Sequence, residues 1–214
     1  MSGRLHCRGL AAVLVVLLSL PAWACPTSLN LMPTADLLEP GTLRLGLEKD
    51  GYPRILGAEC ESYLQFQAGL TPRLEAGLDL YHYDGQTKPA VNAKYLLAQE
   101  GRYPQVALGV SDVCQAIKPF WYIVLARDVG PARLHAGAAR AESTQCAILG
   151  AEFEWRSHLS LVADWRSGPE GYATAGIWWE RGALELGIAV GLANASGEDR
   201  LVMLNLSRTL SLAR

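Results

Sequence analysis

Histidines are the residues of this chain best suited to act as an acid, a base or a metal ligand, and the sequence holds four of them. His6 lies in an N-terminal segment that we expect to be removed, which leaves His82, His135 and His158. Only His135 falls on the polar face of an alternating segment, where Asp164 or Glu152 could partner it. A single histidine of this kind is usually a hydrogen-bonding group, and no Gly-x-Ser-x-Gly segment supplies a nucleophile. We therefore expect no catalytic residue, no metal site and no cofactor.

Charged residues recur on the polar side of the alternating pattern, and we expect them to face a lumen. A lumen lined mainly by carboxylates favours cations if it is open. The alternative is that these charges pair with one another and with water and fill a narrow lumen, which is the arrangement we favour. The set contains three basic and eight acidic residues: Arg44, Glu48, Glu75, Asp79, Lys94, Arg133, Glu152, Glu154, Asp164, Glu180 and Glu185.

The cysteines allow two kinds of covalent chemistry. Cys114 and Cys146 border two neighbouring connections that we expect at the same end of the molecule, so they are the candidate disulfide. Cys60 lies near that end and is the rival partner. Cys25 follows an expected cleavage site and could accept a lipid, although Trp23 is unusual for a lipoprotein signal.

The N-terminus has the organisation of a secretory signal peptide. Arg4 and Arg8 precede a short apolar stretch, and Ala22-Trp23-Ala24 forms a small-residue cleavage motif. The apolar stretch has about half of the roughly 20 residues that a membrane-spanning helix needs. We expect residues 1–24 to be removed, an extended segment at 25–41, and one β-domain at 42–214. The mature chain then carries 17 basic against 21 acidic residues, which disfavours nucleic acid as a partner.

Alternation of apolar with polar or small residues dominates the chain after residue 41 and predicts an all-β fold. One block, 120–127, is apolar on both faces and therefore ambiguous. Twelve blocks can be delimited, at 42–48, 63–70, 74–83, 90–99, 105–113, 120–127, 132–140, 147–155, 159–165, 172–180, 183–192 and 201–210.

The connections between these blocks alternate between two kinds. Short ones, such as 71–73, 156–158 and 181–182, alternate with longer or Gly-rich ones, such as 50–57 and 193–199. Outer-membrane barrels have this asymmetry, with tight periplasmic turns and larger outer loops. The pattern predicts an antiparallel up-and-down meander closed as a transmembrane β-barrel of about 12 strands. Aromatic residues near block ends could form interfacial belts: Tyr81, Tyr83, Tyr95, Trp121, Trp155, Trp165, Tyr172 and Trp179.

Several short motifs resemble those of small bacterial outer-membrane barrels, the YjbH-type and related uncharacterised proteins. They are NLMPTADLLEPG at 30–41, GLTPRLEAGLDLY at 69–81, VNAKYLL at 91–97 and VALGV at 106–110. The resemblance covers about residues 30–206 and implies a barrel in the outer membrane, without naming a ligand. One departure is that the chain ends in Leu210-Ser-Leu-Ala-Arg214, whereas such barrels commonly end in an aromatic residue.

These observations predict an outer-membrane barrel of structural, envelope-associated or narrow-pore type. We expect it to be a monomer surrounded by membrane lipid and without enzymatic activity. The alternative is a soluble or lipid-anchored periplasmic β-protein of lipocalin-like shape that binds a hydrophobic ligand. That alternative needs the Leu-rich face inside, and periodicity alone does not exclude it. A third possibility, an outer-membrane enzyme, would place its chemistry at His135.

Overall fold

The computed structural model describes residues 27–51, 61–83, 85–113, 119–141, 144–195 and 200–212. Within them no helix is long and apolar enough to cross a membrane. The twelve expected strands are all present. Their bounds are β1 Thr42–Gly51, β2 Glu61–Thr71, β3 Leu74–Tyr83, β4 Gln86–Ala98, β5 Gln105–Val113, β6 Phe120–Val129, β7 Ala132–Ala141, β8 Thr144–Arg156, β9 Leu159–Arg166, β10 Tyr172–Arg181, β11 Leu184–Ala193 and β12 Arg200–Ser211.

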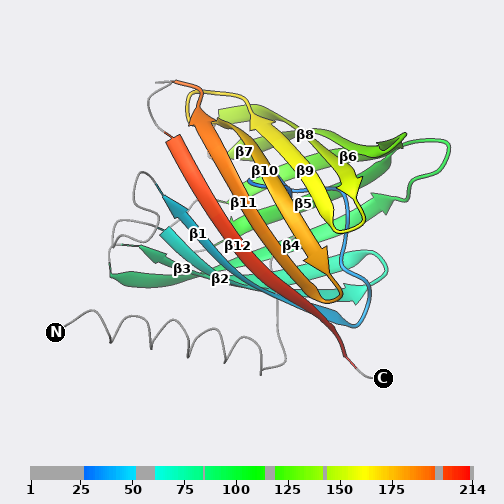
Figure 1. Ribbon diagram of the computed structural model, residues 1–214, viewed down its shortest axis with the longest axis horizontal. Coiled ribbons are helices and arrows are strands. Elements are labelled where there is room, and N and C mark those ends of the chain that lie inside the picture. The colour runs from blue at the N-terminus through cyan, green and yellow to red at the C-terminus, as the bar shows by residue number, and fades with distance from the viewer. Residues whose placement is uncertain are drawn as a thin grey trace.

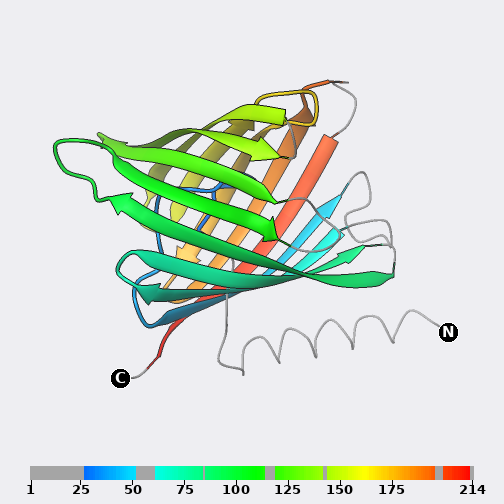
Figure 2. The ribbon, with the colours of Figure 1, turned by 180° about the vertical axis from the view of Figure 1, so that it is seen from behind.

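The strands form one closed antiparallel barrel in which each strand pairs with its sequence neighbours (Figures 1 and 2). The first and last strands close the sheet, with Glu48 of β1 opposite Asn205 of β12 and Leu43 opposite Leu210. Closure leaves no unpaired sheet edge. The expectation of an all-β, closed meander of about 12 strands is therefore confirmed.

The two faces of the wall differ in polarity. Along each strand successive side chains point to opposite faces, and the polar set points inward. Gln67, Glu75, Asn92 and Lys94 are each no more than 1 % exposed. Large apolar side chains instead cover the outside, among them Leu108, Ile123, Leu134, Leu149, Ile177, Ile188, Val190 and Leu204. This polarity is the opposite of what the lipocalin-like alternative requires, because a barrel that binds an apolar ligand needs its greasy face inside.

The first strand begins and the last strand ends at the same end of the barrel. The turns at 72–73, 99–104, 130–131, 157–158 and 182–183, together with the start of β1 and the end of β12, lie at what we call the short-turn end. Gly130 and Gly182 adopt positive φ angles of 62° and 63° there, which tight two-residue hairpins require. The remaining connections lie at the opposite, long-loop end.

Three details differ from the sequence-based expectation. Residues 86–89, expected in a loop, belong to β4. Cys146, expected at the end of a loop, is the third residue of β8 and is buried. Tyr81, expected in an aromatic belt, faces the lumen, where its hydroxyl donates to Glu61 at 2.9 Å. The first two differences concern where a strand begins, which local sequence specifies poorly. Tyr81 faces the lumen because it lies two positions after the inward Asp79 on β3.

Candidate functional site: the plugged lumen

The segment before β1 folds back into the barrel as a hairpin, which we call the plug and define as residues 27–36. Its two legs meet at a Ser28–Pro33 bridge, with Leu29 N donating to Met32 O at 2.9 Å and Thr34 N to Thr27 O at 3.1 Å. The plug appears as the blue segment inside the barrel in Figures 1 and 2. The chain leaves it toward β1, so the leg that ends at Asp36 points to the short-turn end.

The tip of the plug is held by side chains of β9 and β10. Asn30 donates from Nδ2 to Thr174 Oγ1 at 2.9 Å and accepts a hydrogen bond from Trp178 Nε1 at 2.9 Å. One carboxylate oxygen of Asp164 accepts from the backbone N–H groups of Leu31 and Met32, at 2.7 and 3.0 Å. Asn30 and Asp164 are both buried. The polar groups of the plug tip therefore form hydrogen bonds with the barrel wall instead of with water.

Two inward-facing glycines make room for this tip. A Cβ atom at Gly150 of β8 would overlap Cδ1 of Leu29, and a Cβ atom at Gly176 of β10 would lie 2.8 Å from Oδ1 of Asn30. A larger residue at either position would collide with the plug in its present place. The wall is therefore shaped around the hairpin.

The opposite side of the plug packs on an apolar patch of the lumen. Met32 and Ala35 belong to one buried cluster with inward residues of β5 to β8. This explains why the block at 120–127 is apolar on both faces: its inner face is covered by the plug. The wall residues of the cluster are Ala107, Phe120, Tyr122, Val124, Ala126, Ala139, Cys146 and Ile148.

A buried ion pair anchors the base of the plug. Lys94 and Glu75 have fully buried side chains, and Lys94 Nζ lies 3.7 Å from Glu75 Oε1. Lys94 donates to the carbonyls of Thr27 at 2.8 Å and Asp36 at 2.7 Å. Glu75 accepts from Thr27 N at 3.1 Å and from Leu38 N at 2.6 Å. The plug, together with Leu38 just beyond it, thus supplies hydrogen-bonding partners that the two buried charges need.

A second, more exposed anchor is centred on Asp36. Its carboxylate accepts two hydrogen bonds from Arg133 of β7 and one from Gln105 Nε2 at 3.1 Å. Gln105 also donates to Ala35 O at 2.8 Å. Arg133 further contacts Glu100 at 2.8 Å and Asp128 at 2.6 Å. The plug is therefore tied to β4, β5 and β7 as well as to β9 and β10.

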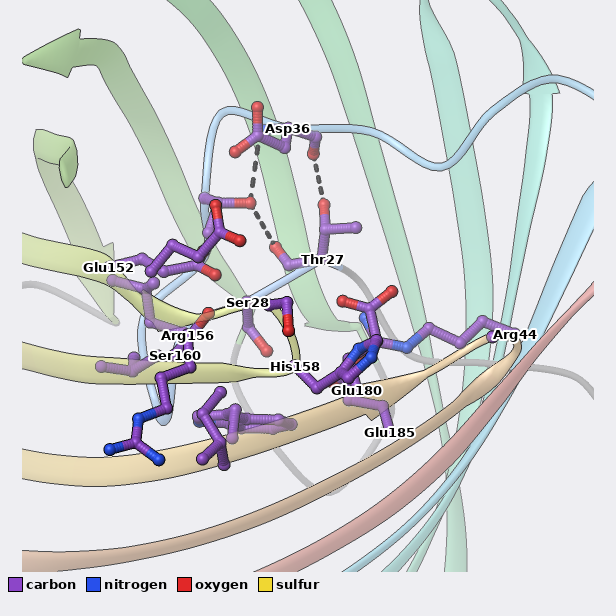
Figure 3. A pocket seen from close by; sticks show the side chains of 18 residues that line it. Thr27, Ser28, Asp36, Arg44, Glu152, Arg156, His158, Ser160, Glu180 and Glu185 are labelled. Carbon is purple, nitrogen blue, oxygen red and sulfur yellow. Dashed lines mark hydrogen bonds and ion pairs between the residues drawn. The ribbon is translucent and has the colours of Figure 1, made fainter. Parts of the chain in front are cut away.

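A cavity of about 550 Å³, which we call the vestibule, lies between the plug and the wall at the short-turn end. It reaches the turn residues Ser157, His158 and Gly182, and Figure 3 shows Thr27, Ser28 and Asp36 of the plug on one side of it. Glu185 pairs there with Arg44. The charged residues that line the vestibule are Asp36, Arg44, Glu152, Glu154, Arg156, Glu180 and Glu185, so acidic groups predominate.

The eleven charges expected in the lumen fall into distinct groups. Glu75, Lys94, Arg133 and Asp164 hold the plug. Arg44, Glu152, Glu154, Glu180 and Glu185 line the vestibule. Glu48 and Asp79 lie farther toward the long-loop end, with Glu48 bonded to Asn205 at 3.0 Å and Asp79 to Asn92 at 2.6 Å.

The histidines do not form a catalytic arrangement with the partners proposed from sequence. His135 is buried, but its nearest acidic group is Asp36, 4.0 Å away, rather than Asp164 or Glu152. Asp164 is occupied by the plug. His82 is exposed and bonds Thr87 at 2.9 Å, and His158 sits at the rim of the vestibule. Across the described ranges no group of three or more His, Cys, Asp or Glu side chains is arranged to hold a metal ion.

Of the cysteines singled out from the sequence, the structure describes Cys146. Cys146 is a buried free thiol whose Sγ lies 3.7 Å from Ala139 O, facing the apolar cluster rather than the loops. Cys114 and Cys60 lie outside the described residues, as do Cys25 and the expected signal peptide. The bridge, the lipidation and the cleavage therefore remain predictions.

The plug itself was not predicted as a functional element. The segment 25–41 was expected only to be extended, because a single hairpin that contacts residues more than 130 positions away leaves no periodic signal. Two features could have indicated it: the apolar inner face of 120–127, and the apolar residues Leu29, Leu31 and Met32 upstream of the first strand.

Comparison with known proteins identifies the fold. No family model matches the chain, and no curated protein matches it in sequence. Among solved structures, the KdgM porin in complex with disordered oligogalacturonate is similar with a TM-score of 0.60 and 7 % identity, over 78 % of this chain and 98 % of that one. The KdgM porin alone gives 0.58 and 7 %, with the same coverage.

A third structure, from work on "the in-meso Crystallization of Membrane Proteins", has a TM-score of 0.53 and 10 % identity, over 80 % of this chain and 84 % of that one. At these identities the likeness concerns the fold alone. The resemblance to YjbH-type proteins in particular stays a prediction. This chain therefore has the closed-meander fold of small porin-like β-barrels.

Proposed function

We propose that this protein is an integral outer-membrane barrel of the narrow-pore type, whose lumen is kept nearly closed by its own N-terminal plug. The observation that carries the proposal is the exposed apolar outer face of a closed barrel whose inner face is polar. A barrel in lipid needs this polarity, because hydrocarbon surrounds the outside and backbone groups must be paired within the sheet.

The aromatic residues of the outer face support a membrane location. Trp121 and Trp165 lie near the long-loop end of their strands, and Tyr95, Trp155 and Trp179 near the short-turn end. Trp121, Trp155 and Tyr95 are 55 %, 52 % and 44 % exposed. Two rows of amphipathic rings separated by aliphatic side chains match the two interfaces of a bilayer. The surrounding partner would then be membrane lipid.

The plug supports a narrow pore. It occupies the lumen between the patch on β5 to β8 and the polar wall on β9 and β10, and the vestibule is the cavity that remains beside it. Because five of the seven charged residues around the vestibule are acidic, small cations are the solutes we expect to pass. The oligogalacturonate bound by the KdgM porin is an acidic sugar chain, and this acidic lining disfavours a ligand of that charge here.

The membrane part of the proposal is tested by fractionation. We expect the protein in the outer-membrane fraction, extracted only by detergent, and migrating faster on a gel before boiling than after it. Recovery as a soluble periplasmic protein would contradict membrane insertion. The same preparation shows by mass whether residues 1–24 are removed and whether Cys25 carries a lipid.

The pore part is tested by locking the plug. In a background without the native cysteines, Leu29→Cys and Gly150→Cys place two thiols where the wall now contacts the plug, within disulfide range. In planar bilayers we expect low conductance from the oxidised pair and higher, cation-selective conductance after reduction or after deletion of residues 27–36. The two single-cysteine variants are the controls.

Two results would redirect the proposal. Equal conductance from the locked and the plug-deleted protein would show that the plug does not close the lumen. No conductance from any of them would favour a structural or envelope-associated barrel. Catalysis forms no part of the proposal.

A further inference from the structure

His135 of β7 lies beneath the plug without a hydrogen bond. Its side chain is 2 % exposed, and among the described residues neither Nδ1 nor Nε2 has a hydrogen-bond partner. A neutral imidazole carries one N–H donor and one acceptor nitrogen, and buried groups of this kind are normally satisfied. This ring therefore needs an explanation other than hydrogen bonding to the wall.

The plug covers His135 from two sides. Gly150 lies directly opposite His135 on β8, and a Cβ atom added there would overlap Cδ1 of Leu29, so the tip of the plug lies beside the ring. Asp36, on the returning leg, lies 4.0 Å from Nε2. Ala126, opposite His135 on β6, belongs to the apolar cluster beneath the plug. The docked plug therefore keeps water away from the ring.

The acids nearest the ring are engaged by other donors. Asp36 already accepts two hydrogen bonds from Arg133 and one from Gln105. Asp164 accepts from the backbone of the plug. Two cations, Arg133 and Lys94, add positive charge on this side of the lumen. The charged groups around the ring are Asp36 of the plug, Glu75 of β3, Lys94 of β4, Asp128 of β6, Arg133 of β7, Glu152 of β8 and Asp164 of β9.

We propose that His135 is a pH switch for the plug, which docks over the neutral ring and is released when the ring is protonated. Protonation turns both ring nitrogens into donors and adds a charge, which a dry site without free acceptors stabilises poorly. With the plug undocked, water in the lumen would hydrate that charge. Histidine in water takes up its proton near pH 6.5, so the undocked state binds more protons below that pH and docking weakens as the pH falls.

The test measures amide hydrogen exchange of the plug in the full protein in detergent, at about pH 7.5 and about pH 5.5, on either side of the ordinary histidine value. The N–H groups of Leu31 and Met32 donate to Asp164 in the docked plug, so their protection from exchange reports docking. Peptides of β11, whose amides pair within the wall, correct for the direct effect of pH on exchange. We expect the protection of the plug to fall about tenfold at the lower pH, which is one unit below the histidine value.

Two substitutions remove the titrating group. His135→Gln keeps a polar side chain, and His135→Phe keeps a ring. In both variants the corrected protection of the plug should be equal at the two pH values. His82→Gln is the matched control and should keep the full response, because His82 is exposed at the long-loop end of β3 and bonds Thr87.

Two results would overturn the proposal. One is a corrected protection that does not fall with pH in the unchanged protein, and the other is a fall that persists in either His135 variant. The measurement does not use conductance. A pH response in a protein that conducts no ions would support the switch while contradicting the narrow pore, so the two proposals can fail separately.

Discussion

Arg133 of β7 donates two parallel hydrogen bonds to the Asp36 carboxylate of the plug, from Nε to Oδ2 at 2.9 Å and from Nη2 to Oδ1 at 2.7 Å. This two-point contact joins the N-terminal segment to a strand almost one hundred positions later in the chain. It fixes both the position and the orientation of the leg that returns to β1. Substitution of either residue therefore tests how strongly this contact holds the plug.

Replacing Asp36 by Asn should loosen the plug without unfolding the barrel. The pair is partly exposed, so we expect a loss of about 1 kcal/mol in plug docking, or roughly a five-fold rise in the undocked population. The measurement is the open fraction in single-channel recordings. Glu39→Gln, a carboxylate on the same segment with an exposed side chain, is the control. An unchanged open fraction in Asp36→Asn would show that this ion pair does not hold the plug.

Gly150→Val should expel the tip of the plug, because its side chain would occupy the space of Leu29. Overpacking of this kind costs about 1–3 kcal/mol. We expect higher conductance and faster proteolysis of the N-terminal segment. Combining the change with Leu29→Ala should restore the closed state. Ala151→Val, on the outer face of the same strand, adds comparable bulk outside the lumen and should have little effect on either readout.

Lys94→Ala should destabilise the folded protein by about 3–5 kcal/mol, because it leaves the buried Glu75 carboxylate without its cation. The double change Lys94→Met and Glu75→Gln should cost clearly less, since no uncompensated charge remains. Urea unfolding of the detergent-solubilised protein measures both. Equal losses from the single and the double variant would show that the hydrogen bonds to the plug, rather than the charge balance, carry the stability.

Glu100, in the turn between β4 and β5, should make the stability of the folded protein depend on pH in the acidic range. The backbone N–H of Asp128 donates to Glu100 at 3.0 Å and, with the Arg133 guanidinium, holds the pKa of this carboxyl below its ordinary value of 4.5. Its contribution is therefore present above pH 4.5 and is lost as the pH falls through the lower folded-state value. Urea midpoints across this range should fall less in Glu100→Gln than in the unchanged protein.

Ile188→Arg distinguishes a membrane barrel from a soluble one. Ile188 lies in the middle of β11 and is 53 % exposed on the outer face. In lipid the arginine should cost about 2–4 kcal/mol, whereas Leu192→Arg, near the strand end, should cost about 0–1. Unfolding from vesicles gives both values. A negligible cost at both positions is the result expected of an outer face that meets water.

The sequence was sufficient to predict the wall of the barrel. Alternation identified eleven of the twelve strands, the block at 120–127 being apolar on both faces, and the two kinds of connection identified the two ends, because both signals are local. The same period of two places residues such as Glu75 and Lys94 on one face, and their burial in the structure shows that this face points inward. Once a strand is placed, each of its side chains is assigned to one face.

The same local patterns could not predict what fills the lumen. Contacts such as Asn30 with Thr174, or Leu31 with Asp164, join one short hairpin to distant strands and follow no repeat. The ambiguity of 120–127 marked the place where something apolar had to cover Val124, but not what covered it. The bond between Tyr81 and Glu61 likewise depends on the register between β2 and β3.

Because the plug is joined to β1 by only a few residues, it behaves as a ligand that is always present. A tether this short gives an effective concentration in at least the millimolar range, independent of how dilute the protein is. In the proposed pore, a solute that crosses the lumen must displace this tethered ligand from Thr174, Trp178 and Asp164. In the proposed pore, entry would therefore depend less on the width of the barrel than on the affinity with which the chain binds its own N-terminal segment.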